Sequence, residues 1–116
     1  MSSRPDPPAS SVVLSEVTAW PGVHTAPGRR GELRVLLGRR ELGHLHGDHA
    51  AHFSFPKATW RELREQGEIV PHPVFPDAEG PAARQIEDAA DVAAVIALFR
   101  RNYERAVAKR RAGSAG

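Results

Sequence analysis

Near the C-terminus, apolar residues recur at the spacing of a helix face. The stripe predicts one long amphipathic helix and consists of Val92, Val95, Ile96, Phe99, Tyr103 and Val107. Asp88 stands before the stripe in the position of an N-cap, and Gly113 follows it as a terminator. We therefore expect a helix that packs one face against a core and exposes the other.

In the middle of the chain the period changes to two, which predicts a hairpin of two strands. Leu33, Val35 and Leu37 alternate with their neighbours in the pattern of a half-buried strand. A Gly-Arg-Arg turn follows, and the chain returns over residues 41–46. A third strand is expected over 52–55.

The returning strand of this hairpin carries two histidines at a spacing of two residues. Side chains two apart on a strand point to the same face of a sheet. We therefore expect Leu42, His44 and His46 to share one face, with Glu41 and Leu45 on the other. Two imidazoles would then lie side by side on the sheet.

The remaining elements have weaker signals. We expect helices over 12–20 and 56–66, short strands over 23–26 and 82–86, and an extended edge segment over 69–75 that contains two prolines. Together the elements predict an α+β fold. It would be a small antiparallel sheet of three to five strands, packed by two or three helices, with a long amphipathic helix at the C-terminus.

The length of 116 residues fits one domain. We expect a disordered arm over 1–10, a single domain over 11–111 and a disordered tail over 112–116. The chain has no cysteine, which excludes disulfides, thiolate catalysis and cysteine-ligated zinc. It also lacks an apolar run of the ~18 residues that span a bilayer and an N-terminal signal sequence. The expectation is a cytoplasmic protein without a membrane partner.

The net charge is +2, from 16 basic and 14 acidic residues. The basic pairs are scattered along the chain, whereas a nucleic-acid interface needs them on one face. This distribution argues against a nucleic-acid partner. A protein or a small molecule is the expected partner, and the oligomeric state is not indicated.

Histidines concentrate between positions 44 and 52. The segment from His44 to His49 reads H-x-H-x-D-H, which is similar to the metal-binding motif of the metallo-β-lactamase superfamily. Members of that superfamily draw further ligands from positions far downstream, whereas only His52 and His72 follow His49 here. A match of six residues without that context does not indicate the fold.

Two hypotheses remain for these side chains. In the first, which we favour, the domain is a binding or interaction module that needs no cofactor. It would present a histidine-rich rim made of His44, His46, Asp48 and His72. In the second, it is a small metal-dependent or acid/base enzyme. His44, His46 and His72 would then be candidate ligands of a divalent metal, with Asp48 orienting one of the histidines.

Several segments between Trp20 and Arg105 resemble, in order, those of the bacterial luciferase-like domain family. The most specific is the hairpin from Gly38 to Asp48, which ends in His-Leu-His-Gly-Asp. The others are Trp20-Pro21-Gly22-Val23, Phe53-Ser54-Phe55-Pro56-Lys57, Glu62-Leu63 with Gly67, Pro71-His72-Pro73-Val74-Phe75-Pro76-Asp77, Asp91-Val92 and Tyr103-Glu104-Arg105. The resemblance implies a small α+β domain and no particular reaction. Flavin-dependent bacterial luciferases are TIM barrels of about 250 residues, and this sequence has no flavin-phosphate motif.

Overall fold

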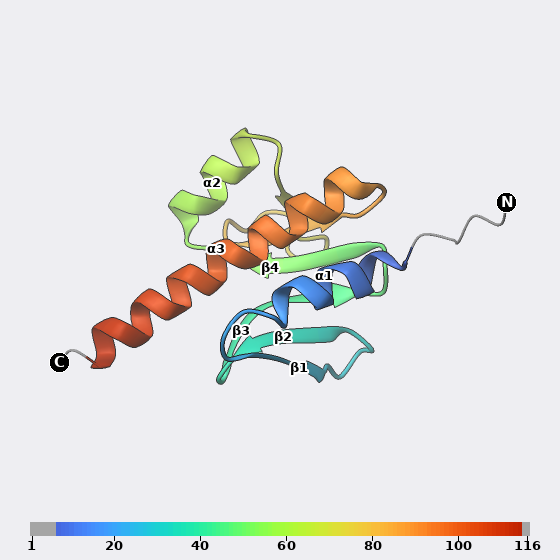
Figure 1. Ribbon diagram of the computed structural model, residues 1–116. Coiled ribbons are helices and arrows are strands. Elements are labelled where there is room, and N and C mark those ends of the chain that lie inside the picture. Colours follow the sequence, from blue (N-terminus) through green and yellow to red (C-terminus); the bar gives the residue numbers. More distant parts are fainter. Residues whose placement is uncertain (1–6, 115–116) are drawn as a thin grey trace, which may run out of the picture.

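The computed structural model describes residues 7–114, which form an antiparallel sheet and three helices (Figure 1). The helices are α1 (Ala9–Val17), α2 (Lys57–Glu65) and α3 (Ala89–Ser114). The strands are β1 (Val23–Pro27), β2 (Leu33–Leu37), β3 (Arg40–His46), β4 (Ala50–Ser54), β5 (Val70–Pro71) and β6 (Pro81–Gln85). The sheet has six strands in the order β1-β2-β3-β4-β6-β5.

The predicted α+β class is confirmed, including the long C-terminal helix. The sheet has one strand more than the expected upper number, because the two-residue β5 pairs with β6 at the edge. Its proline lacks a backbone donor, which suits an edge position. Among the described residues, no helix is long and apolar enough to cross a membrane.

Helices extend into both of the expected terminal segments. Helix α1 begins at Ala9, within the expected N-terminal arm, and α3 continues to Ser114, within the expected tail. Helix α1 starts early because the Asp48 carboxylate accepts the backbone N–H of Ser10 at 2.8 Å, a tertiary cap that local sequence does not reveal. Residues 1–6 of the expected arm and 115–116 of the tail lie outside the described residues.

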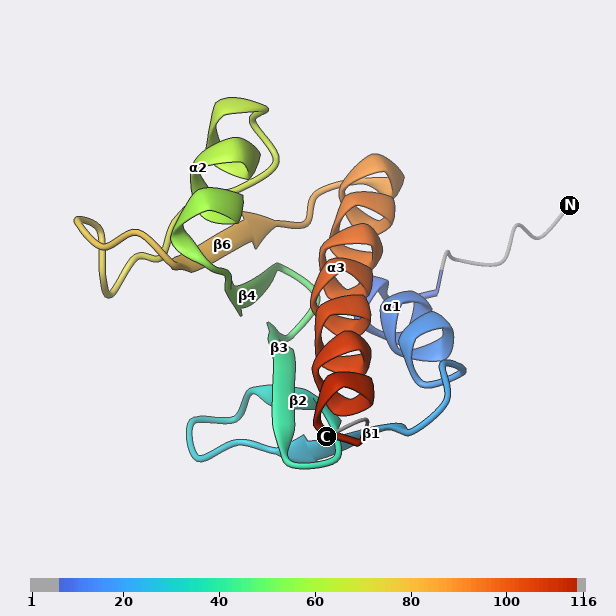
Figure 2. The same cartoon turned by 90° about the vertical axis from the view of Figure 1, so that its left-hand side faces the viewer.

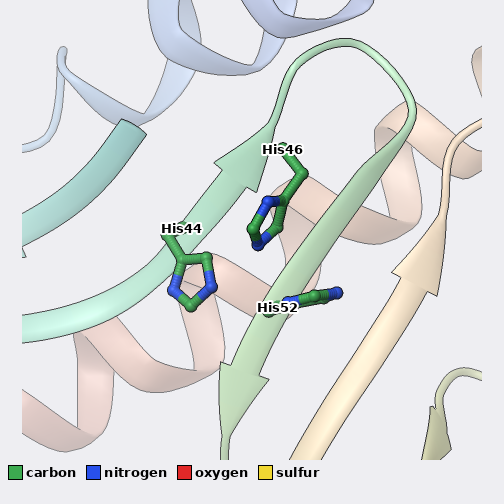
Figure 3. Close-up of side chains that lie close together, drawn as sticks. All are labelled: His44, His46 and His52. Carbon is green, nitrogen blue, oxygen red and sulfur yellow. The ribbon is translucent and has the colours of Figure 1, made fainter. Parts of the chain in front are cut away.

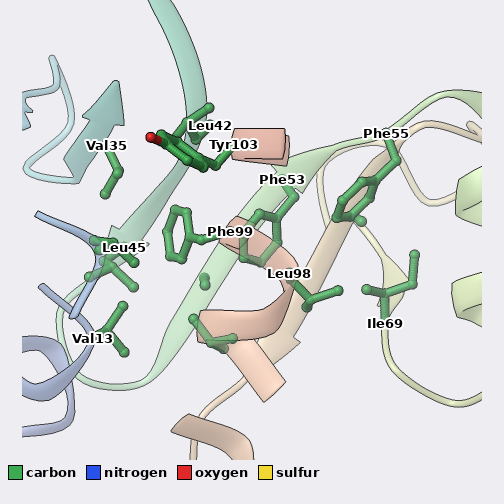
Figure 4. Packing of buried hydrophobic residues seen from close by; sticks show 14 of the residues in the cluster. Val13, Val35, Leu42, Leu45, Phe53, Phe55, Ile69, Leu98, Phe99 and Tyr103 are labelled. Carbon is green, nitrogen blue, oxygen red and sulfur yellow. The ribbon is translucent and has the colours of Figure 1, made fainter. Parts of the chain in front are cut away.

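The hydrophobic core lies between one face of the sheet and the helices α1 and α3 (Figure 2). Phe99 of α3 is completely buried and its ring meets Phe53 of β4 edge-on, with 4.8 Å between the ring centroids. Helix α2 adds Trp60 and Leu63 to the same cluster. Figure 4 shows how side chains from both halves of the chain interdigitate in this layer.

A β-bulge in β3 changes the face of the sheet to which one of its side chains points. Val35 is opposite Gly43 and Leu36 is opposite Glu41, so Leu42 is the extra residue in β3. The bulge turns Leu42 into the core, where it is 1% exposed. The expectation that Leu42 shares a face with His44 and His46 is therefore wrong. Beyond the bulge, the alternation resumes with Leu45 in the core and the two histidines on the opposite face.

On the face away from the core, two loops project beyond the sheet. Figure 2 shows the β1–β2 loop and the β5–β6 loop on the side opposite α1 and α3. The β5–β6 loop is tied by backbone hydrogen bonds from Phe75 to His72 and from Ala78 to Phe75. These loops flank the sheet surface that carries the histidines.

Candidate metal site

His44, His46 and His52 come together on the open face of the sheet (Figure 3). His44 and His46 share this face because they lie two apart on β3, and His52 of β4 is the direct antiparallel partner of His44. One ring nitrogen from each of the three lies within 4.8 Å of the others. The ring centroids of His46 and His52 are 4.3 Å apart, and those of His44 and His46 are 4.9 Å apart.

Two nitrogens in this cluster are buried without a hydrogen-bond partner in the protein. They are Nε2 of His46 and Nδ1 of His52. A buried polar atom without a partner costs about 1–3 kcal/mol. An ion or a water molecule bound at such an atom restores the missing interaction. Both unpartnered nitrogens belong to residues of the convergent set.

The third histidine is held by a short chain of charged groups. Nδ1 of His44 lies 3.2 Å from the Glu41 carboxylate, whose other oxygen accepts a hydrogen bond from Nε of Arg34 at 2.8 Å. A carboxylate at Nδ1 favours the tautomer that keeps its proton there. Nε2 of His44 is then the free nitrogen. This carboxylate–imidazole pair is the arrangement that commonly orients a metal-bound histidine.

The surroundings of His46, His52 and His72 favour the neutral form of each ring. Burial is the main cause that lowers the pKa of His52, and the positive charges that His72, His46 and His44 would carry add to it, so that the pKa is about 4. Burial also lowers the pKa of His46 and of His72, with smaller contributions from neighbouring histidines. Only the neutral ring offers a lone pair to a metal.

The depressed pKa of His52 makes the metal-free protein sensitive to acid. The unfolded chain takes up a proton at this residue near pH 6.5, whereas the folded chain does so only near pH 4. Between these values the unfolded state binds more protons, so stability falls as the pH falls through this window. The loss is at most about 3 kcal/mol, and less than that because the ring is half-buried.

Denaturant unfolding of the chelator-treated protein at pH 7 and pH 4.5 measures this effect. The variant His52→Gln should lose less stability over the same interval, and the difference between the two proteins isolates His52 from the titrating carboxylates. Equal losses in both proteins would contradict the assignment.

His72 lies beside this cluster without joining it. Its ring centroid is 4.2 Å from that of His52, but its Nδ1 accepts the backbone N–H of Val74 at 3.1 Å. This bond leaves the proton of the neutral ring on Nε2, which is then a donor and not a ligand. The sequence predicts His72 in the ligand set with His44 and His46, whereas the group that converges in the structure contains His52 in its place. The conformation of the β5–β6 loop excludes His72 from the ligand set, because it places the Val74 N–H on the Nδ1 of His72.

Asp48 is not a member of the group formed by His44, His46 and His52. Its carboxylate accepts the backbone N–H of Ser10 at 2.8 Å and caps α1. Hydrogen bonding to Ser10 lowers its pKa. No hydrogen bond joins Asp48 to a histidine among the described residues, and its contact with Ser10 agrees with a structural role at the β3–β4 turn. His49, in the same turn, is exposed.

A cavity of about 660 Å³ lies over the three histidines and extends to His72. Its volume is within the range of small-molecule sites. The charged side chains of its wall are Arg29, Arg30, Glu32 and Arg34, from the β1–β2 loop and β2. The opposite wall comes from the β5–β6 loop. A ligand in this space would lie against the face of the sheet that carries the histidines.

A family model for the luciferase domain matches residues 39–102, which is over half of the chain. The chain belongs to the luciferase domain family. The comparisons with curated proteins and with solved structures give no match. In this luciferase domain the matched segment includes all four histidines of the cavity, whereas Arg29, Arg30 and Arg34 lie before it.

Proposed function

We propose that this luciferase domain binds a divalent transition-metal ion through His44, His46 and His52, with an open coordination position toward the cavity. The observation that supports the proposal most is the pair of buried, unpartnered nitrogens within a set of three convergent imidazoles. An interaction module with a histidine rim would leave these nitrogens unsatisfied. The metal proposal accounts for them.

Zinc suits this set of donors best. Imidazole is a ligand for Zn, Cu, Ni and Fe, whereas Mg and Ca prefer oxygen. Zn–N bonds of 2.0–2.1 Å in a tetrahedron place the nitrogens about 3.3 Å apart. The observed spread, within 4.8 Å, requires the rings to move together slightly by side-chain rotation. Sites with three protein ligands keep a fourth position for water or substrate.

The open position defines what the ion can do. Three neutral imidazoles leave the ion its full charge of 2+, so it attracts anions and polarises a bound carbonyl or water. The cavity above the histidines provides space for such a ligand. We therefore propose metal-dependent binding of a small molecule as the function of the domain.

Titration of zinc into chelator-treated, tag-free protein tests the proposal by calorimetry. We expect one equivalent to bind with a Kd below about 1 µM, and magnesium to give no heat. The His49→Ala variant is the matched control, since His49 is exposed in the turn next to the site. Its zinc affinity should equal that of the parent. Absence of stoichiometric uptake by the folded parent would contradict the proposal.

A further inference from the structure

We infer that the cavity over the histidines binds a small organic carboxylate with an apolar body, whose carboxylate reaches the metal position and whose body lies against the β5–β6 loop. The inference rests on the proposed metal site and names the ligand that this site takes. Its basis is the division of the cavity into a cationic part and an apolar part.

The cationic part is formed by the β1–β2 loop and β2. Three arginines and one glutamate line the cavity there. Arg34 is paired with Glu41, whereas neither Arg29 nor Arg30 takes part in an ion pair among the described residues. Glu32 opposes them, although its carboxylate accepts the backbone N–H of Arg30 at 3.1 Å. With a metal ion beside them, these groups favour an anion.

His72 adds a donor between the two parts. Because its Nδ1 accepts the Val74 N–H, its neutral ring carries the proton on Nε2. The ring is half-buried and lines the cavity next to His52. A fixed N–H donor beside a metal position suits the second oxygen of a carboxylate.

The apolar part is formed by side chains that would otherwise face water. Val74 is 60% exposed and Phe75 is 52% exposed, and both line this cavity. Pro27 lines it from the end of β1. The Phe75 ring lies 5.4 Å from that of His72, so the apolar surface begins next to the donor. An apolar body placed here would remove these side chains from water.

This division distinguishes a carboxylate with an apolar body from other anions. Inorganic phosphate would satisfy the cations and leave Val74 and Phe75 exposed. An alcohol with the same chain would cover these side chains and leave Arg29 and Arg30 without a counter-charge. The two ends of the cavity together require both properties in one molecule.

Binding of octanoate to the zinc-loaded full chain tests the inference, with acetate, 1-octanol and inorganic phosphate as comparison probes. We expect octanoate to bind at least about tenfold more tightly than each of them, as measured by calorimetry, since its chain adds buried apolar area. In the cobalt-substituted protein, octanoate should also change the visible absorption spectrum, because its carboxylate enters the coordination sphere.

Variants in the apolar part and in the cationic part of the cavity test the contribution of each part separately. Phe75→Ser should weaken octanoate about fivefold and leave acetate within twofold. Val12→Ser on α1 is its control, since Val12 is also exposed but lies away from the cavity. The double variant of Arg29 and Arg30 to glutamine should weaken both carboxylates. The same change at Arg39 and Arg40, which do not line this cavity, should weaken neither.

The two proposals fail in different ways. If the protein takes up no zinc or cobalt, the proposed function fails, and the inference fails with it. If the metal binds with one equivalent but octanoate binds no more tightly than acetate, or less tightly than phosphate, only the inference is overturned. Equal octanoate affinity with and without metal would also overturn the placement of the carboxylate.

Discussion

Replacing His52 with alanine is expected to lower the zinc affinity of this luciferase domain by roughly 100- to 1,000-fold. This is the loss we expect when one of three imidazole ligands is removed. His52 supplies one of the convergent nitrogens, and its Nδ1 is buried without a partner. The metal-free variant should remain folded, because the change removes an unsatisfied polar atom. Competition with a chromophoric chelator measures the affinity, and circular dichroism checks the fold.

His72→Ala is the contrast that makes this prediction specific. The two rings are neighbours, with 4.2 Å between their centroids, but the Nδ1 of His72 is occupied by the Val74 N–H. Zinc affinity should therefore change little in His72→Ala. Glu41→Gln should weaken zinc by about 10- to 100-fold, since Glu41 orients His44 without touching the metal position. Equal losses in His52→Ala and His72→Ala would contradict the assigned ligand set.

Replacing Gly43 with alanine is expected to lower the free energy of unfolding by about 2 to 3 kcal/mol. A Cβ at this position would lie 2.7 Å from Cδ1 of Phe53, 2.8 Å from Cε1 of Phe99 and 2.9 Å from the backbone oxygen of His52. The two rings are buried in the core, and the oxygen belongs to the β3–β4 pairing. Denaturant unfolding of the metal-free protein measures the loss.

The control for this change is Gly113→Ala, near the end of α3. A Cβ at Gly113 would have no heavy atom within 4 Å. Alanine is also the better helix former, so this variant should be as stable as the parent or slightly more so. A Gly43→Ala protein with parental stability would show that β3 can move away from Phe53 and Phe99. In that case the close packing behind the histidines would not hold the site in place.

The fold was largely predictable from local patterns. The helical stripe from Val92 to Val107 and the alternation at Leu33, Val35 and Leu37 each reflect the geometry of one element against one core. The bulge at Leu42 was not predictable in this way. It depends on the register between β2 and β3, which places one extra residue between two pairs and turns Leu42 inward.

The candidate site was predictable in part. The spacing of His44 and His46 indicated neighbouring imidazoles, and the structure places their centroids 4.9 Å apart. His52 was missed as a ligand, although a signal existed. His44 and His52 stand at equal distances from the centre of the turn at 47–49, so a hairpin register would have paired them.

The sequence by itself determined which segments form the long helix and the central hairpin and which two histidines share a strand face, because these properties depend on spacing along one element. The tertiary structure alone decided that His52 joins them and that His72 and Asp48 do not. Each of those outcomes depends on contacts between distant segments: the β3–β4 pairing, the fold of the β5–β6 loop around Val74, and the start of α1 against the β3–β4 turn. Such contacts form only when the whole chain packs around one core, so no local pattern records them.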